Sequence, residues 1–337
     1  MRCYHRPIPP RSAAMPLDIV VVMDPIGSIR IAKDSTFAML LEAQIRGHRL
    51  LYVVPGGLSL RDGVALANVR ELSVRDDPGD WYEMGPASHV ALGKGHVVLM
   101  RKDPPVDPAF VHDTQILGLS QRAGALVVND PQGLRDMNEK LTALEFPQCC
   151  PPTLVSRDAA TIKAFITEHG DAVLKTLDGM GGKSIFRARA GDPNINVILE
   201  TLTDGGRHLA MAQRFIPEIS AGDKRILLVD GEPVDYCLAR IPQGDEFRGN
   251  LAVGGRGEGR ALSDRDRWIA AQVGPEMKRR GMLFVGLDVI GDYLTEVNVT
   301  SPTCIRELDG LYGLNIAGDL FDVIEARAGA AQPSTAA

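Results

Sequence analysis

The chain of 337 residues lacks any apolar run that approaches the ~18 residues needed to cross a bilayer as a helix. Its first 14 residues carry arginines but no apolar centre, so they do not form a secretory signal. Positive charge is not in excess either: the formal net charge is -6, which disfavours a general nucleic-acid surface. We therefore expect a cytoplasmic protein without a membrane or nucleic-acid partner.

Two further patterns are missing. The five cysteines show no Cys/His spacing typical of a zinc site, which favours a reducing compartment. After the first apolar segment the chain reads "DPIGSIR", with one glycine where a dinucleotide-binding turn needs three, so a nicotinamide oxidoreductase is disfavoured. The chain does contain 45% hydrophobic residues, enough for a sizeable core.

Strand and helix patterns alternate in the first third of the chain. Short apolar runs at 17–23, 49–54, 97–101 and 125–129 predict strands, and a helical pattern at 34–47 separates the first two. This alternation predicts a parallel α/β domain over roughly 15–135. The paired prolines of "CCPPT" (149–153) then mark a joint between this domain and the rest of the chain.

The segment "LDGMGGKS" (177–184) has the end of a phosphate-binding Walker loop but not its start, since Leu177 stands where the first glycine is needed. Both flanks predict strands, so the loop should connect two strands rather than a strand and a helix. Its glycines can bring backbone N–H groups close to a ligand, as in a flap over phosphates. A plain hairpin turn is the alternative, although three glycines in four positions exceed what most two-residue turns need.

Two apolar segments on either side of a Gly-Asp pair contain Asp288, Glu296 and Asn298. Glu-x-Asn on one strand places both side chains on the same face. Two carboxylates within ~4 Å would repel by about 4 kcal/mol at an effective dielectric near 20, and a divalent cation removes that cost. A two-residue turn would separate Asp288 from Glu296, so a metal site predicts a turn of three or five residues. A solvated strand face is the alternative.

The segment 240–260 is rich in glycine and carries Arg248 and Arg256, with few residues that build a core. Such a loop suits a lid that closes over anionic intermediates and excludes water. A mobile surface loop is the alternative.

Together these segments resemble the prokaryotic glutathione synthetases of the ATP-grasp superfamily, over about residues 17–327. The most specific strings are "MRKDPP" and "NVTSPTCIRE", with "DSTFAMLLEAQ", "LRDMNEKL" and "RGNLAVGGRGE" in agreement. The resemblance implies an α/β and α+β fold, in which an N-terminal parallel α/β (pre-ATP-grasp) domain precedes a two-part ATP-grasp domain. The implied division is a disordered extension (1–14), an N-terminal substrate-binding domain (15–135), an ATP-grasp domain (136–328) with a lid subdomain (138–212), a C-terminal subdomain (213–328) and a mobile loop (241–257), and a disordered tail (329–337).

The resemblance also implies roles for single residues. The implied ATP-binding residues are Lys140, Lys175, Gly179, Met180, Gly181, Gly182, Gln213, Arg214, Phe215, Ile216 and Asp223. Cations near the transferred phosphate would be Arg225, Arg240, Arg248 and Arg256. Mg²⁺, or Mn²⁺ in its place, would bind Asp288, Glu296 and Asn298, and the peptide would contact Arg101, Ser301, Pro302 and Thr303. Thr176 and Lys183 depart from the family pattern beside the flap.

The activity that the resemblance implies is ligation of glycine to γ-glutamylcysteine with ATP as co-substrate, through an acyl phosphate, giving glutathione, ADP and phosphate. The partners would be these small molecules and further copies of the chain, a homotetramer by resemblance. Two alternatives are an ATP-grasp ligase for another acid and amine, and a non-catalytic nucleotide-binding protein. The complete set of lysines, flap and acidic residues disfavours the latter. So do the arginines of the glycine-rich loop, which a protein that only binds a nucleotide does not need.

Overall fold

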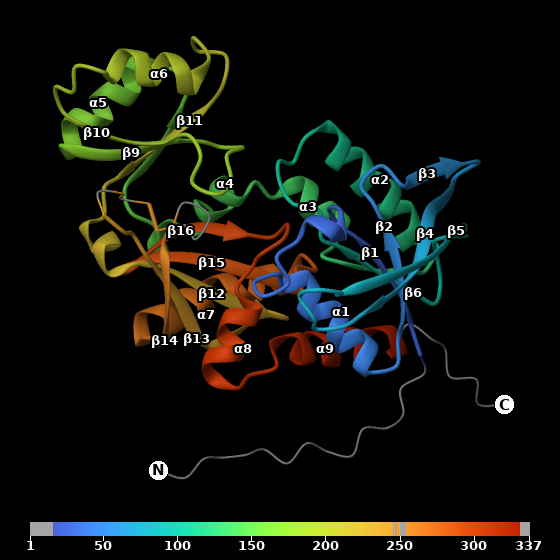
Figure 1. Ribbon diagram of the computed structural model, residues 1–337. Coiled ribbons are helices and arrows are strands. Elements are labelled where there is room, and N and C mark those ends of the chain that lie inside the picture. The colour runs from blue at the N-terminus through green and yellow to red at the C-terminus, as the bar shows by residue number, and fades with distance from the viewer. Residues whose placement is uncertain (1–15, 245, 247, 250–253, 331–337) are drawn as a thin grey trace, which may run out of the picture.

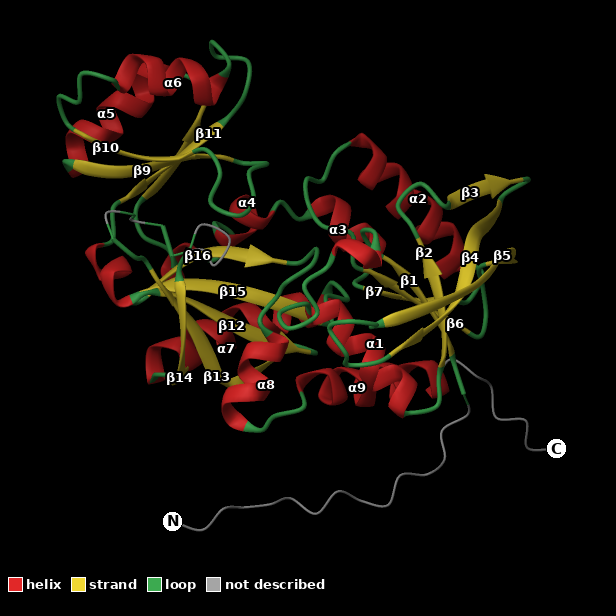
Figure 2. Cartoon of the chain, viewed as in Figure 1, coloured by secondary structure: helices red, strands yellow, loops and turns green. Residues whose placement is uncertain are grey.

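The computed structural model describes residues 16–244, 246, 248–249 and 254–330, organised around three sheets (Figures 1 and 2). The expected extension 1–14, part of the loop 241–257 and residues 331–337 lie outside the described residues. The last helix runs to Ala330, so residues 329 and 330 are helical and not part of a disordered tail.

The N-terminal sheet has seven strands in the order β3-β4-β2-β1-β6-β7, with β5 paired to β4. The four segments expected as strands form its parallel part, so that prediction is confirmed. The antiparallel strands β3, β4 and β5 were not predicted, because their many exposed, polar positions lack a long apolar run. The bounds are β1 Asp18–Val22, β2 Arg49–Val53, β3 Leu58–Arg61, β4 Val64–Val74, β5 Tyr82–Ala91, β6 His96–Met100 and β7 Leu126–Val128.

Helices cover both faces of this sheet. The first begins after Asp34, which caps it: Asp34 Oδ1 accepts a hydrogen bond from the Phe37 backbone N at 2.6 Å. Ile19 of β1 shares a buried cluster with Phe37, whereas Val20 shares another with Phe110. The bounds are η1 Ile26–Ser28, α1 Ser35–Ile45, α2 Pro108–Arg122, α3 Pro131–Asp136 and α4 Glu139–Ala143.

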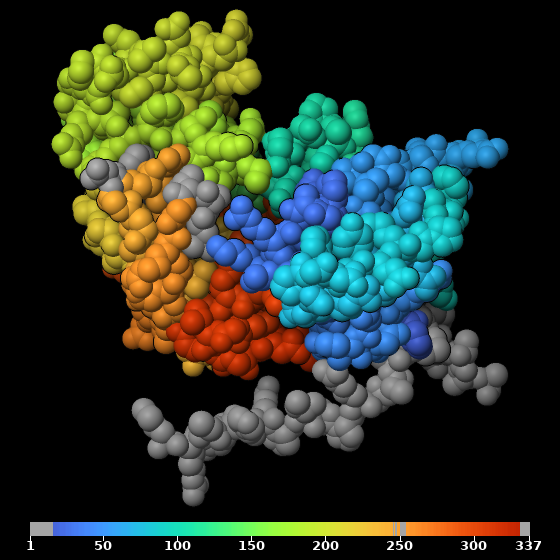
Figure 3. All heavy atoms as spheres, viewed as in Figure 1, coloured from blue at the N-terminus to red at the C-terminus, as the bar shows by residue number. Residues whose placement is uncertain are grey.

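Residues 153–214, which we call the lid, form a separate lobe (yellow-green in Figure 3). Their antiparallel sheet, in the order β10-β9-β11-β8, packs against α5 and α6. Ile162, Leu174 and Leu199 lie in a buried cluster that draws on lid residues alone. The bounds from the preceding short helix onward are η2 Pro147–Cys149, β8 Thr153–Ser156, α5 Ala159–His169, β9 Asp171–Thr176, β10 Ile185–Arg189, α6 Ile195–Thr203 and β11 Ala210–Arg214.

The C-terminal sheet is antiparallel, in the order β14-β13-β12-β15-β16. Its buried residues share both clusters of the N-terminal domain: Val285 joins the cluster of Phe110, and Leu227 joins that of Phe37. The N-terminal domain and C-terminal sheet therefore form one unit, which we call the body. The bounds are η3 Pro217–Ala221, β12 Asp223–Val229, β13 Glu232–Ile241, β14 Arg256–Ala261, α7 Asp264–Arg279, β15 Phe284–Ile290, β16 Tyr293–Asn298, α8 Ile305–Tyr312 and α9 Ile316–Ala330.

No helix within the described residues is long and apolar enough to span a membrane.

Candidate active site

Two cavities adjoin where the lid meets the body. The first lies between β9, β10 and β11 of the lid and β15, β16 and η3 of the body, and every residue expected to bind ATP lines it. The second extends from there toward the segments 103–104 and 300–304. Both are lined by the flap and by two carboxylates: Gly179, Met180, Gly181, Asp288 and Glu296.

One end of the first cavity is apolar and was not predicted. Val173, Ile185, Ile216, Ile219 and Ile290 line it, and of these only Ile216 was expected in the site. The others are ordinary strand or short-helix hydrophobics in the sequence, so nothing local distinguishes them from core residues. An apolar slot beside charged groups suits a planar base attached to phosphates.

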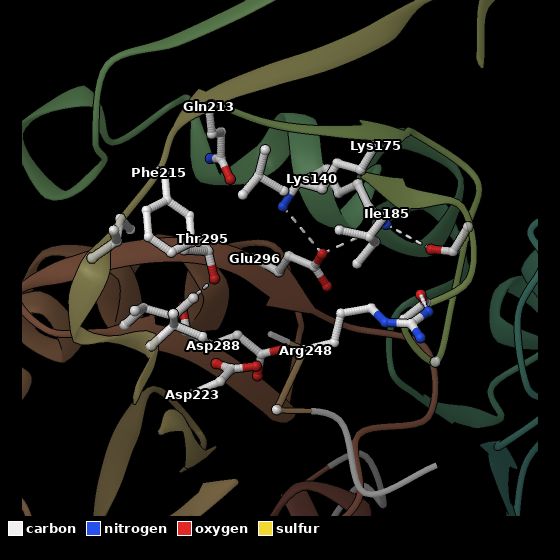
Figure 4. Close-up of a pocket in the computed structure, with 18 of the residues that line it drawn as sticks. Lys140, Lys175, Ile185, Gln213, Phe215, Asp223, Arg248, Asp288, Thr295 and Glu296 are labelled. Carbon is white, nitrogen blue, oxygen red and sulfur yellow. Dashed lines mark hydrogen bonds and ion pairs between the residues drawn. The ribbon is translucent and has the colours of Figure 1, made fainter. Parts of the chain in front are cut away.

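The charged end of the first cavity brings two lysines to one carboxylate (Figure 4). Lys175 Nζ lies 3.3 Å from Glu296 Oε1, and Lys140 Nζ lies 3.7 Å from the same oxygen. Burial lowers the pKa of Lys175, against the attraction of Glu296. Burial opposes ionisation of Glu296, but Lys140 and Lys175 outweigh it and hold its pKa below the ordinary value. Phosphate oxygens of a ligand can therefore replace the Glu296 carboxylate as the partner of these two amines.

A second charged cluster lies on three neighbouring strands of the body. Arg225 on β12 and Arg240 on β13 contact Asp288 Oδ1 at 2.6 and 3.0 Å, and Arg240 also contacts Asp223 at 2.5 Å. Burial opposes ionisation of Asp288, but the two guanidinium groups outweigh it and lower its pKa. Burial raises the pKa of Asp223, whose Oδ1 is buried without a hydrogen-bond partner among the described residues. That oxygen can accept a hydrogen bond from a ligand hydroxyl.

The turn between β15 and β16 differs from the prediction. The strands are joined by two residues, so the expected turn of three or five residues is wrong. Asp288 nevertheless pairs with Glu296, because the register shifts and Val289 pairs with Leu294. The extra residue is Thr295, which forms a β-bulge and donates its hydroxyl to the Asp288 carbonyl at 3.1 Å. The bulge turns the two carboxylates to the same side, as the odd-length turn would have done.

These carboxylates and Asn298 fit a divalent cation shared with a ligand. Asp288, Glu296 and Asn298 all line the second cavity. The Asn298 side-chain nitrogen donates to the Gly286 carbonyl at 3.3 Å, which leaves the amide oxygen as the atom able to coordinate. The described residues contain no group of three or more His, Cys, Asp or Glu side chains able to hold a metal. Mg²⁺ suits such a site, since it commonly takes one or two carboxylates and completes its shell with waters and phosphate oxygens.

The glycine loop connects β9 to β10, so its predicted strand-to-strand path is confirmed. A Cβ on Gly179 would lie 2.7 Å from Thr176 Oγ1, so this position accepts only glycine without a shift of its neighbour. Two cations hold the loop by its carbonyls: Lys140 Nζ donates to Gly179 O and Arg248 Nη1 donates to Gly182 O, each at 2.6 Å. The loop is therefore placed as a cover over the first cavity.

The expected peptide-binding residues divide into two groups. Ser301, Pro302 and Thr303 line the second cavity. Arg101 does not line it, but lies buried behind this turn and donates to the Pro302 carbonyl at 3.0 Å. Burial lowers its pKa to about 10. The structure thus gives Arg101 a supporting contact to the turn.

The two arginines expected from the glycine-rich loop, Arg248 and Arg256, differ in position. Arg248 lines the first cavity together with Lys183, the residue that departs from the family pattern. Arg256 begins β14, is 62% exposed in its side chain and pairs with Glu258 at 3.2 Å. It lines neither cavity within the described part of the chain, so the structure does not bring it to the other site residues.

A cavity between two antiparallel sheets, lined by lysines, a glycine flap and paired carboxylates, defines an ATP-grasp ligase. Solved structures agree on the fold: the ATP-grasp ligase PsnB (TM-score 0.59, 16% identity, 92% of this chain and 98% of that chain) and the D-cycloserine synthetase DcsG (TM-score 0.63, 13% identity, 92% and 99%). At such low identity these likenesses concern the fold alone.

Family models give the finer identification. The prokaryotic glutathione synthetase N-terminal domain matches residues 17–135, and the prokaryotic glutathione synthetase ATP-grasp domain matches residues 139–313. Glutathione synthetases from Xanthomonas campestris pv. campestris (78% identity, 93% of this chain and 99% of that protein) and Xylella fastidiosa (strain Temecula1; 68%, 92% and 99%) are close relatives. The chain belongs to the prokaryotic glutathione synthetase family. It catalyses the ATP-dependent ligation of glycine to γ-glutamylcysteine, which produces glutathione.

Proposed function

We propose that this ligation proceeds through an acyl phosphate formed where the two cavities meet. The carboxylate of the cysteine residue of γ-glutamylcysteine attacks the γ-phosphorus of ATP, the bond to the bridging oxygen breaks, and ADP leaves. The amine of glycine then attacks the acyl carbon, loses a proton, and inorganic phosphate leaves. The observation that carries this proposal is that the flap, Asp288 and Glu296 line both cavities, so a phosphate in one lies next to a carboxylate in the other.

The nucleotide would lie in the first cavity. Its base would occupy the apolar slot beside Ile185, next to the backbone after β11, and Asp223 would accept from the ribose. Lys140, Lys175 and the flap would hold the phosphates. Each of these groups is positive or donates N–H groups, and each lines the cavity.

Enzymes of this family use ATP and a divalent metal ion. We assign Mg²⁺, with Mn²⁺ as a substitute, to Asp288, Glu296 and Asn298. When bound, the ion would neutralise charge on the phosphate oxygens. Arg225 and Arg240 lie next to Asp288 and would stabilise the transferred phosphoryl group, and Arg248 would close the flap side. Ser301, Pro302 and Thr303 would contact the peptide.

The isotope content of the products tests the acyl phosphate. With γ-glutamylcysteine labelled by ¹⁸O in its cysteine carboxylate, one labelled oxygen should appear in inorganic phosphate for each glutathione formed. Phosphate free of label would reject the acyl phosphate and leave the ligase assignment intact.

Chelation of divalent ions should stop turnover, and Mg²⁺ should restore it.

The site assignments have separate tests. Thr303→Ala should raise the KM for γ-glutamylcysteine and leave the KM for ATP unchanged, because Thr303 lines the second cavity and not the first. Equal changes in both constants would reject the peptide assignment.

We further propose a cytoplasmic homotetramer, on the basis of the family resemblance. Light scattering of the purified protein measures its oligomeric state, and a monomeric mass would reject the tetramer.

A further inference from the structure

One carboxylate at the site, Glu139, has no part in the proposed reaction. It is the first residue of α4, and its side chain lines the second cavity. Its Oε1 accepts three hydrogen bonds, from the Val299 backbone N at 3.1 Å, the Thr300 backbone N at 3.2 Å and the Thr300 hydroxyl at 2.8 Å. These donors begin the turn 299–304, whose next residues are those assigned to the peptide.

The residues on either side of Glu139 reach the nucleotide half of the site. Lys140 Nζ donates to the flap carbonyl of Gly179 at 2.6 Å and lies 3.7 Å from Glu296. Asn138 caps α4 and donates its amide to the Leu177 carbonyl, at the start of the glycine loop, at 3.3 Å. Three consecutive residues thus contact the flap, a proposed metal ligand and the peptide turn.

The far side of the same turn is held by the N-terminal domain. Arg101 donates to the Pro302 carbonyl at 3.0 Å, and the Ser301 hydroxyl donates to Asp103 Oδ1 at 2.5 Å. These contacts fix the turn relative to the end of β6. They do not fix it relative to the flap. Glu139 connects the turn itself to α4 and so to Lys140, beside the contact that Lys140 makes with Glu296 on the preceding strand.

We propose that Glu139 is a positioning residue that holds the turn 299–304 in register with the phosphate-binding lysines, and that it thereby sets the affinity for the peptide substrate. Burial raises the pKa of Glu139, and the two hydrogen bonds from Thr300 oppose that rise and favour the ionised carboxylate. Hydrogen bonds to ionised groups are stronger than neutral ones, which suits a carboxylate to this task. The inference rests on the proposed assignment of Ser301, Pro302 and Thr303 to γ-glutamylcysteine.

The test compares Glu139→Gln with a matched control, Glu145→Gln. Glu145 lies six positions later, pairs with Arg280 on the surface and lines neither cavity. We expect Glu139→Gln to raise the KM for γ-glutamylcysteine about tenfold, equivalent to about 1.4 kcal/mol. The KM for ATP should change less than about twofold, and Glu145→Gln should leave both constants unchanged. Equal changes in both KM values, or none, would overturn the proposal.

A second pair of variants covers the case in which Glu139→Gln does not fold. Thr300→Val removes one of the three donors and keeps the side-chain shape, whereas Thr300→Ser keeps the hydroxyl. Thr300→Val should raise the peptide KM about threefold, and Thr300→Ser should restore the original value. No difference between Val and Ser would overturn the proposal, because a purely steric role needs no hydroxyl.

The outcomes also separate this inference from the proposed function. If Thr303→Ala raises the peptide KM and the Glu139 and Thr300 variants do not, the peptide assignment stands and the positioning role fails. If Thr303→Ala also leaves the peptide KM unchanged, the assignment of the turn fails first, and the inference fails with it.

Discussion

The lid and the body build their halves of the site in different ways. The body contributes Asp288, Arg225 and Arg240 from three adjacent strands of one sheet, above a core that is continuous with the N-terminal domain. The lid contributes Lys175 and the flap from a sheet with its own small core. Polar contacts cross between them, such as Arg214 Nη2 to the Tyr293 hydroxyl at 3.0 Å.

This difference suggests a division of work between fixed charge and a movable cover. Charged groups held in a packed sheet need no reorganisation when the phosphoryl group is transferred, which is the condition for electrostatic stabilisation. A lobe with a separate core can rotate on polar contacts without disturbing those charges, which is the condition for admitting ATP and then excluding water. Substitutions in the body, in the lid core, at Lys175 and in the loop that carries Arg248 and Arg256 each test this division of work.

Loss of the body's central carboxylate should have the largest effect. Asp288→Asn leaves Arg225 and Arg240 without their shared buried anion, which should cost about 3–5 kcal/mol of unfolding free energy. It should also lower kcat by roughly 10²–10³, the effect of losing one preorganised donor, because Arg225 and Arg240 lose the anion that orients them. Urea unfolding and steady-state kinetics measure both. Glu258→Gln, a change at an exposed residue of the same sheet, is the control. Full activity in a folded Asp288→Asn enzyme would refute fixed charge as the body's contribution.

A cavity in the lid core should act on the lid alone. Leu174 is 1% exposed, so Leu174→Ala should destabilise its cluster by about 2–5 kcal/mol. Because that cluster does not continue into the body, amide exchange should accelerate in 153–214, and the KM for ATP should rise several-fold. The matched change Leu287→Ala, at a fully buried residue of the body, should accelerate amide exchange in both parts of the body, the N-terminal domain and the C-terminal sheet. The same exchange pattern in both variants would show that the two cores unfold together.

The lid lysine should impose an alkaline limit on ATP use. Burial lowers the pKa of Lys175 from its ordinary 10.5, so the charge that attracts phosphate disappears as pH rises through a lower value. The kcat/KM for ATP, which reports on the free enzyme, should therefore fall with a midpoint below 10.5. Lys175→Arg keeps its charge and should move that decline to higher pH, at a lower kcat. If the fall in kcat/KM keeps the same midpoint in Lys175→Arg, a group other than Lys175 causes it.

Local patterns in the sequence predicted the parallel strands and the strand-to-strand glycine loop, because apolar runs and glycines act over a few residues. The Glu-x-Asn pattern likewise placed Glu296 and Asn298 on one strand. The bulge at Thr295 was not predictable, since a register shift depends on how two strands pair and not on either strand alone. The apolar slot was missed for a related reason: Val173 and Ile185 resemble core residues until the second sheet is placed opposite them.

The smallest effect should come from the glycine-rich loop that carries Arg248 and Arg256. Arg248 contacts the flap carbonyl of Gly182 at 2.6 Å, whereas Arg256 pairs with Glu258 on the exposed strand β14. Exposed ion pairs contribute little, so Arg256→Ala should change kcat and both KM values less than about twofold. Arg248→Ala should raise the KM for ATP about fivefold, because it releases one of the two cations that hold the flap. A larger loss in Arg256→Ala than in Arg248→Ala would show that the loop brings Arg256 to the phosphates when substrates bind. The cover would then include β14 of the body as well as the lid.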